Sequence, residues 1–170
     1  MDNYYRARHL QVSDNQGYKN FDLPSSFERE LFHDHLIQLI KGNRITIEKY
    51  IFNNESSVSH ITIDPAPIII VEGLFIYHYQ EINNQLDFKA MMDLKLSSCF
   101  SRRLKRDTTC RNYDETEVRH RYFEHVEPSY HKYIEPFKLD MDLLIDNSES
   151  IEDGMKELVS LIQSRLLIAQ

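Results

Sequence analysis

The sequence contains little cysteine, little glycine and no tryptophan. Its two cysteines, Cys99 and Cys110, are too few for a disulfide framework or a zinc site, which favours two free thiols in a reducing cytoplasm. No apolar stretch approaches the roughly 20 residues that a membrane span needs, and the first ten residues hold no signal-peptide core. We therefore expect a cytoplasmic protein without a membrane segment.

Acidic residues outnumber basic ones, and the formal net charge is −7. The surface as a whole therefore does not attract nucleic acid or an anionic membrane, and phosphate binding requires a local cluster of cations. A length of 170 residues suits one domain with its own hydrophobic core. Because repeats, low-complexity tracts and Pro/Gly linkers are absent, we expect residues 1–170 to form a single domain.

Apolar spacing from Phe27 to Lys41 predicts a helix. Ser25 and Glu28 have the spacing of a capping box, and Gly42 stands where a left-handed C-terminal cap is expected. Further helices are expected over residues 100–109, 115–126 and 151–167.

The segment Pro67–Gly73 is a continuous β-branched run that ends in an acid and a glycine. A run that is apolar on both faces is typical of a buried parallel strand. Other strands are expected over 45–50 and 58–63, as an antiparallel pair, and over 92–96 and 141–145. Strands that alternate with helices predict an α/β fold whose mainly parallel sheet has helices on both faces. Ligands bind such sheets at the carboxyl ends of the strands.

One acidic residue and one cationic segment have the chemical character needed to bind Mg²⁺ and phosphate groups. Glu72, at the end of the β-branched run, is placed to hold Mg²⁺ or its water ligands, and the alternative is an acid that caps a helix or pairs with an arginine. The segment Ser101–Asp107 is cationic, with Arg103 and Arg106 on one side of a helix. Guanidinium groups suit phosphoryl oxygens. The alternatives are a solvated basic face, or an RNA-binding patch that the net acidity disfavours.

Acids beside aromatic residues occur at Asp2, which precedes Tyr4 and Tyr5, and within Asn20–Pro24. Such an acid can deprotonate a sugar hydroxyl while an aromatic ring packs against a base. A second acid can accept hydrogen bonds from ribose hydroxyls. The alternative for Asp2 is a solvated terminus.

The order and spacing of these motifs resemble the uridine kinase family of P-loop nucleoside kinases, from Asp2 to about Asp146. The matching motifs are Asp-x-Tyr-Tyr, Asn-Phe-Asp-x-Pro-x-x-Phe, Ile-Ile-Val-Glu-Gly-Leu, Met-Asp-Leu-Lys, Arg-Arg-x-x-Arg-Asp and the run Val126–Lys138. The resemblance implies a three-layer P-loop-kinase-like fold. It also implies ATP-dependent phosphorylation of a nucleoside 5′-hydroxyl in pyrimidine salvage, with ATP and Mg²⁺ as cofactors.

The resemblance implies a role for each matched residue. Asp2 corresponds to the base that accepts the proton of the 5′-hydroxyl, and Glu72 to the acid that helps hold Mg²⁺. Arg106 and Arg111 correspond to lid arginines around the ATP phosphates. The implied substrate-binding residues are Tyr5, Phe21 and Tyr50 around the nucleoside, Asp22 and Arg103 on the ribose, and Glu55 and Arg121 at two further pocket positions.

The sequence departs from the family pattern at its start and around the pocket. The family has a strand, a Gly-x-x-x-x-Gly-Lys-Ser/Thr loop, a helix and a strand ahead of the catalytic acid, whereas Asp2 follows Met1 and none of the four glycines lies in such a loop. Glu55 stands in place of a base-contacting His, and Arg121 in place of a Gln. The Arg-Gly-Arg of the lid is replaced by Arg111-Asn112-Tyr113. The change at Glu55 predicts a preference for cytidine, or another amine-bearing nucleoside, over uridine.

Three hypotheses remain from the sequence. The first is a uridine-kinase-like enzyme that is inactive as this chain alone, because distant arginines cannot replace the missing phosphate loop. Its missing segment is truncated, misassigned or supplied by another chain. The second is a non-catalytic relative that binds a nucleoside or a protein partner, and the third is an RNA-binding module that uses Arg102–Arg111. The partners expected are a nucleoside and ATP, without nucleic acid or membrane, and a homo-oligomer is a further option.

Overall fold

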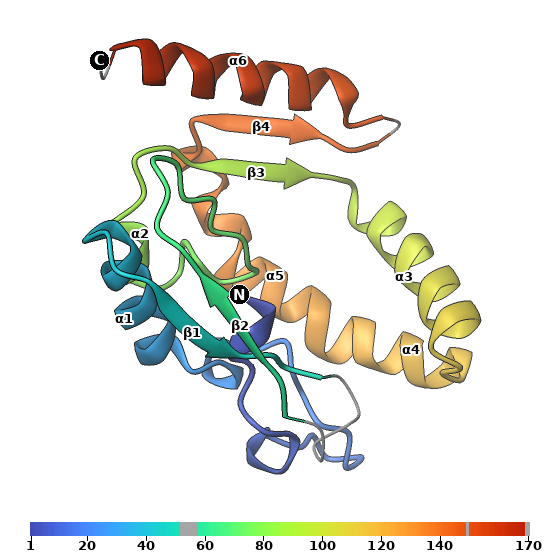
Figure 1. Ribbon diagram of the computed structural model, residues 1–170. Coiled ribbons are helices and arrows are strands. Elements are labelled where there is room, and N and C mark those ends of the chain that lie inside the picture. The colour runs from blue at the N-terminus through green and yellow to red at the C-terminus, as the bar shows by residue number, and fades with distance from the viewer. Residues whose placement is uncertain (52–57, 149, 169–170) are drawn as a thin grey trace. The chain divides into compact units, whose positions relative to one another are not determined.

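The computed structural model describes residues 1–51, 58–148 and 150–168 (Figure 1). The chain divides into two compact units. Unit 1 contains Met1–Leu86 and Pro128–Ile134, and unit 2 contains Asp87–Glu127 and Glu135–Gln170. The expectation of a single domain stays a prediction.

Unit 1 is built from short helices and one β-hairpin. The hairpin pairs β1 with β2 in antiparallel register, from Ile45 opposite Ile63 to Glu48 opposite His60, which confirms the predicted pair with shorter strands. The elements are 3-10 helices at Asp2–Tyr4, Arg8–Leu10 and Pro24–Ser26, α1 (Arg29–Ile40), β1 (Ile45–Glu48), β2 (His60–Ile63), α2 (Gln80–Asn83) and most of α5 (Glu127–Tyr133).

The predicted first helix forms as α1, but its predicted capping box is wrong. Glu28 is the residue that precedes the helix, and no side chain of the described residues caps this end. Ser25 lies instead within a separate 3-10 turn, so it is too far from the first α-helical amide groups to accept a hydrogen bond from them. The predicted left-handed cap at Gly42 is confirmed by its φ of 81°.

The prediction that Pro67–Gly73 is a buried strand is wrong. All seven residues of this run are described, and none of them pairs with another strand in a β-sheet. Ile70 is 80% exposed, whereas Ile69 and Val71 pack against the core. The physical reason is that β-branched residues favour an extended backbone, but a strand also needs a neighbour to satisfy its backbone hydrogen bonds. The run therefore stays outside the sheet, with Ile69 and Val71 partly buried against the core.

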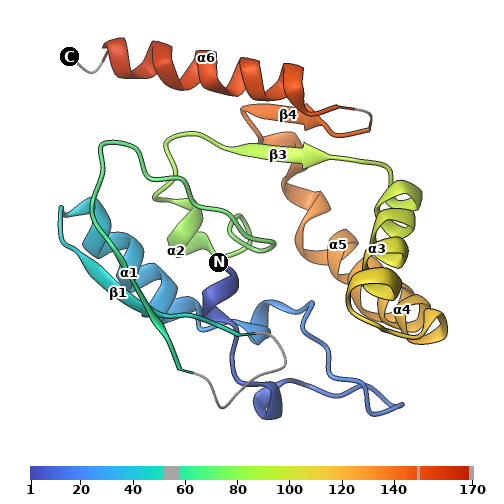
Figure 2. The same ribbon diagram turned by 45° about the vertical axis from the view of Figure 1, so that its right-hand side comes forward.

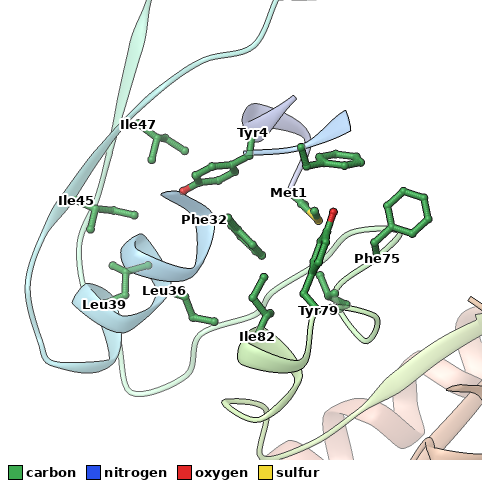
Figure 3. Close-up of a cluster of buried hydrophobic side chains, with 12 residues drawn as sticks. Met1, Tyr4, Phe32, Leu36, Leu39, Ile45, Ile47, Phe75, Tyr79 and Ile82 are labelled. Atoms are coloured by element: carbon green, nitrogen blue, oxygen red, sulfur yellow. The ribbon is translucent and has the colours of Figure 1, made fainter. Parts of the chain in front are cut away.

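The core of unit 1 gathers side chains from α1, β1, the segment after Gly73 and the first residues of the chain (Figure 3). Phe75 and Ile82 are fully buried. Met1 and Tyr4 belong to the same cluster, so packing fixes the segment that carries Asp2. The cluster consists of Met1, Tyr4, Phe27, Phe32, Leu36, Leu39, Ile45, Ile47, Phe75, Ile76, Tyr79 and Ile82.

Burial of Tyr4 makes the stability of this core decrease as the pH rises in the alkaline range. Its hydroxyl lies 2.9 Å from His35 Nδ1, and burial raises the pKa of Tyr4 to about 12. An unfolded tyrosine ionises near pH 10, so the contribution of Tyr4 is complete below about pH 10 and is lost as the pH rises towards about 12.

We expect the free energy of unfolding, measured by urea titration, to fall over this interval. Tyr4→Phe should remove about 2–3 kcal/mol of that fall, because a shift of one pKa unit corresponds to about 1.4 kcal/mol. Tyr18→Phe, at a tyrosine outside the core cluster, is the control and should keep the whole decline. An unchanged decline in Tyr4→Phe would contradict the assignment.

Unit 2 contains a parallel pair of strands followed by a long helix (Figure 1). β3 and β4 run in the same direction, from Ala90 opposite Leu143 to Asp93 opposite Asp146, which confirms an α/β fold with a parallel sheet. Its elements are β3 (Ala90–Asp93), α3 (Leu96–Cys110), α4 (Glu115–Arg121), a π-helical turn (Tyr122–Val126), a 3-10 helix (Glu135–Asp140), β4 (Leu143–Asp146) and α6 (Glu152–Ile168).

The helices of unit 2 differ from the predicted ones in their detail. The helix expected over 115–126 ends at Arg121 and continues as the π-helical turn. α6 packs along β4 (Figure 2), and a Cβ at Gly154 would lie 2.4 Å from Ile145 Cγ2, so glycine permits this close approach. Among the described helices, none combines the length and the apolar character that a membrane crossing needs.

Candidate active site

The N-terminal segment of unit 1 lies against Glu72. The N-terminal amino group of Met1 donates hydrogen bonds to the backbone oxygen of Glu72 at 2.7 Å and to its Oε1 at 2.8 Å. A Cβ at Gly73 would lie 2.4 Å from Met1 Cβ, so the two backbone segments pass too closely for any other residue at this position. Asp2 follows with an exposed side chain. The structure thus brings together the main chains that carry the predicted base, Asp2, and the predicted metal-holding acid, Glu72.

The three predicted nucleoside aromatics form one half-buried cluster around Tyr5. The ring centroid of Tyr5 lies 5.8 Å from that of Phe21 and 5.4 Å from that of Tyr50. On its inner side Tyr5 packs against the buried Phe27, and the two ring centroids lie 4.1 Å apart. Asn3 Oδ1 also accepts a hydrogen bond from the backbone of Tyr50 at 3.2 Å. Because Asp2 lies three residues before Tyr5, the acid and the aromatic cluster are connected by a short, packed segment.

Asp22 is held on a turn next to Phe21. Asn20 Oδ1 accepts a hydrogen bond from the backbone N–H of Asp22 at 2.8 Å, a local arrangement typical of Asx turns. The buried Ser129 donates a hydrogen bond from its hydroxyl to the backbone oxygen of Asp22. This contact explains part of the Val126–Lys138 motif. Glu55 lies outside the described residues.

The predicted phosphate arginines meet at Asp107 in unit 2. Arg106 Nε donates to Asp107 Oδ1 at 2.8 Å, while Arg103 Nε and Arg111 Nη1 lie 3.3 Å from carboxylate oxygens of the same residue. Asp107 is buried. No role was predicted for Asp107, although its spacing of four residues from Arg103 and from Arg111 places the three side chains on one helix face.

Asn112 accounts for one departure from the family pattern. It stands in place of the lid glycine and has a φ of 55°, in the left-handed region. Asparagine tolerates this region better than most residues that carry a side chain. The backbone N–H of Tyr113 donates to the backbone oxygen of Asp107 at 3.1 Å across this turn. The substitution therefore preserves a turn that keeps Arg111 near Asp107.

Arg121, expected at a ribose-holding position, is engaged within its own helix. Its Nε and Nη2 each lie 2.8 Å from Glu117 Oε1, and its guanidinium carbon lies 5.7 Å from the ring centroid of Tyr113. Only 14% of its side chain is exposed. A contact between Arg121 and ribose stays a prediction.

The carboxyl edge of the parallel strands carries two acids that the sequence analysis did not single out. Asp93 and Asp146 end β3 and β4 side by side. Lys138 Nζ contacts both carboxylate oxygens of Asp93, at 2.8 and 2.7 Å. A hydrogen bond from the side chain of Ser148 lowers the pKa of Asp146. Asp93 belongs to the Met-Asp-Leu-Lys motif, so the motif supplied a signal for its position but not for its partner.

Comparison with protein-family models identifies the chain. The model described as "Phosphoribulokinase / Uridine kinase family" matches residues 1–152. The chain belongs to this family. The phosphoribulokinase/uridine kinase family has a P-loop kinase fold, in agreement with the parallel pair of unit 2, and membership supports a nucleoside kinase function.

Curated relatives agree with the family assignment. The chain is 32% identical to a uridine kinase of Borrelia garinii subsp. bavariensis over 167 residues, which cover 96% of this chain and 79% of that protein. It is 31% identical to a uridine kinase of Shewanella halifaxensis, and 30% identical to one of Proteus mirabilis. Each of these two matches extends over 145 residues and covers 85% of this chain and 68% of the relative.

Proposed function

We propose that these residues form the nucleoside-binding and proton-accepting part of a kinase that phosphorylates the 5′-hydroxyl of a pyrimidine nucleoside with ATP. The observation that carries the proposal is the packing of the N-terminal segment. Met1 packs against Gly73 and its nitrogen contacts the backbone oxygen of Glu72, Tyr5 anchors the aromatic cluster, and Asp2 lies between Met1 and Tyr5 in the chain. The segments that carry the proposed base, the proposed metal-holding acid and the proposed stacking surface are therefore connected through residues 1–5.

The nucleoside would bind through its base and its ribose. Aromatic rings provide a stacking surface for a base, and Phe21 and Tyr50 are partly exposed next to Tyr5. The carboxylate of Asp22 would accept hydrogen bonds from the ribose hydroxyls, because a carboxylate is a hydrogen-bond acceptor and a hydroxyl can donate. Asp2 then accepts the proton of the 5′-hydroxyl as that oxygen attacks the γ-phosphorus of ATP, while the bond between this phosphorus and the β,γ-bridging oxygen breaks and ADP leaves.

The family's cofactors fit the residues that are present. Mg²⁺ prefers oxygen ligands and often binds one or two carboxylates together with substrate phosphates, and the side chain of Glu72 is 73% exposed. When bound, Mg²⁺ would neutralise charge on the phosphate oxygens. Arg106 and Arg111, about half exposed, suit the ATP phosphates.

A second candidate is a nucleoside-binding relative without phosphate transfer. The observation in its favour is that Arg121, expected at the ribose, is engaged by Glu117 within its own helix, and that Glu55 replaces the base-contacting His of the family pattern. In the first candidate, the backbone N–H groups of a phosphate loop bind the ATP phosphates, and the lysine and hydroxyl of that loop complete the site. Both candidates predict nucleoside binding, and only the first predicts turnover once a phosphate loop is supplied.

Calorimetric titration with cytidine and uridine tests nucleoside binding. We expect Phe21→Ala to weaken cytidine binding by about 10-fold, since stacking on one aromatic side chain contributes about 1–3 kcal/mol. Phe123→Ala, which removes a half-exposed ring in unit 2, is the matched control and should leave the affinity unchanged. Cytidine should bind more tightly than uridine if Glu55 reads the base. Equal effects of the two phenylalanine variants would contradict the proposed pocket.

A further inference from the structure

Asp107 is a buried carboxylate in α3 that contacts three arginines. Its side chain is 4% exposed. One of its oxygens, Oδ1, lies 2.8 Å from Arg106 Nε and 3.3 Å from Arg111 Nη1, and the other, Oδ2, lies 3.3 Å from Arg103 Nε. One acid thus contacts each arginine of this segment that the resemblance assigns to ribose or phosphate.

Local geometry explains how three arginines reach one acid. Arg103 and Arg111 are four residues before and after Asp107, a spacing that places side chains on the same helix face. Arg111 lies just after the end of α3, and the left-handed turn at Asn112 redirects the chain behind it. Arg106 reaches the carboxylate from the neighbouring position. The cluster is therefore assembled within one helix and its C-terminal turn.

The charge of the cluster is not balanced. A buried carboxylate needs a cation, but a single guanidinium neutralises it. Within these four residues, three positive charges against one negative charge give a formal sum of +2. Guanidinium groups this close repel one another, and a bound anion relieves that repulsion. The side chains of Arg106 and Arg111 are 50% and 41% exposed, so an anion in solvent can reach them.

We propose that Asp107 is a positioning residue that holds Arg103, Arg106 and Arg111 together as one clamp for the polyphosphate of a nucleotide. The identity of this ligand rests on the proposed function. Asp107 does not contact the ligand, because its negative charge would repel a phosphate. It fixes the guanidinium groups before the ligand arrives, and this reduces the ordering cost of binding. It also connects Arg103, expected at the ribose, with the arginines expected at the phosphates.

Calorimetric titration of the 170-residue chain with inorganic tripolyphosphate at low ionic strength tests the clamp without nucleoside or metal. Asp107→Asn removes a negative charge beside the arginines, so electrostatics alone predicts tighter binding. Positioning predicts the opposite, an affinity about 5-fold weaker or more. Asp153→Asn removes the same charge from an exposed site on α6 and should change the affinity by less than about 2-fold. Unchanged or tighter binding by Asp107→Asn overturns the proposal.

Because Asp107 is buried, a measurement on the unaltered chain accompanies the variant. Nitrogen-15 NMR should show the Nε–H of Arg106, which donates to Asp107, as a slowly exchanging signal that tripolyphosphate shifts without abolishing. Asp107→Glu keeps the carboxylate and should retain this signal and more of the affinity than Asp107→Asn. Fast exchange of the Arg106 signal in the unaltered chain, or no response to tripolyphosphate, contradicts the positioning role.

These experiments, together with a phosphorylation assay on a chain extended at Met1 by the strand–P-loop–helix–strand segment of a family member, separate this inference from the proposed function. Tripolyphosphate binding that depends on Asp107 supports the clamp even if no nucleoside is phosphorylated, and in that case only the proposed function fails. Nucleoside phosphorylation that survives Asp107→Asn with unchanged KM for ATP would support the proposed function and overturn the clamp.

Discussion

We expect Asp2→Asn to lower kcat by about 10²-fold or more in a chain extended at Met1 by the strand–P-loop–helix–strand segment of a family member, because general-base catalysis contributes on this scale. Asparagine keeps the size of the side chain but cannot accept the proton of the 5′-hydroxyl. Asp2 is exposed and lies at the start of a 3-10 helix, so the change should not disturb the core. The KM for the nucleoside should change little.

Steady-state kinetics with cytidine and Mg-ATP measures this effect. Asp64→Asn is the matched control, because Asp64 is an exposed acid of unit 1 that pairs with Arg44 away from the aromatic cluster. It should keep kcat within about 2-fold of the unaltered enzyme. A near-normal kcat in Asp2→Asn would show that another group accepts the proton.

The 170-residue chain by itself should show no turnover of cytidine or uridine with Mg-ATP. Positioning and electrostatic stabilisation provide nearly all the catalysis in phosphoryl transfer, and the phosphate loop supplies much of both. The arginines at Asp107 provide charge but no array of backbone N–H groups. ADP release measured with and without nucleoside tests this expectation. Turnover that survives repurification and disappears in Asp2→Asn would contradict it.

Local patterns in the sequence predicted those helices and strands whose hydrogen-bond partners lie nearby in the chain. Alternating apolar residues gave the β1–β2 pair, and the left-handed position of Gly42 marked the end of α1. The run Pro67–Gly73 had the composition of a strand but no partner strand among the described residues, so composition alone gave the wrong element. A β-ladder depends on a second segment, and no local pattern supplies one.

In the candidate site, too, contacts between residues close in sequence could be predicted, whereas contacts between residues far apart in sequence could not. The order of family motifs predicted Tyr5, Phe21 and Tyr50 around a nucleoside. Their rings lie next to one another in the structure, and their contact with a nucleoside stays a prediction. The contact between Met1 and Glu72 joins residues 71 positions apart, so no spacing rule predicts it. The arginine contacts of Asp107 were available from helical spacing, but their meaning depended on the burial of that carboxylate, which the structure supplies.

The most direct test of the central claim is to identify the product of the extended chain. Cytidine and ATP labelled at the γ-phosphate are incubated with the extended chain, and the products are examined by phosphorus NMR and mass spectrometry. We predict that cytidine 5′-monophosphate forms, that it carries the labelled phosphate, and that it is absent with Asp2→Asn. ATP hydrolysis without a phosphorylated nucleoside, or phosphate on a 2′- or 3′-hydroxyl, would contradict the account.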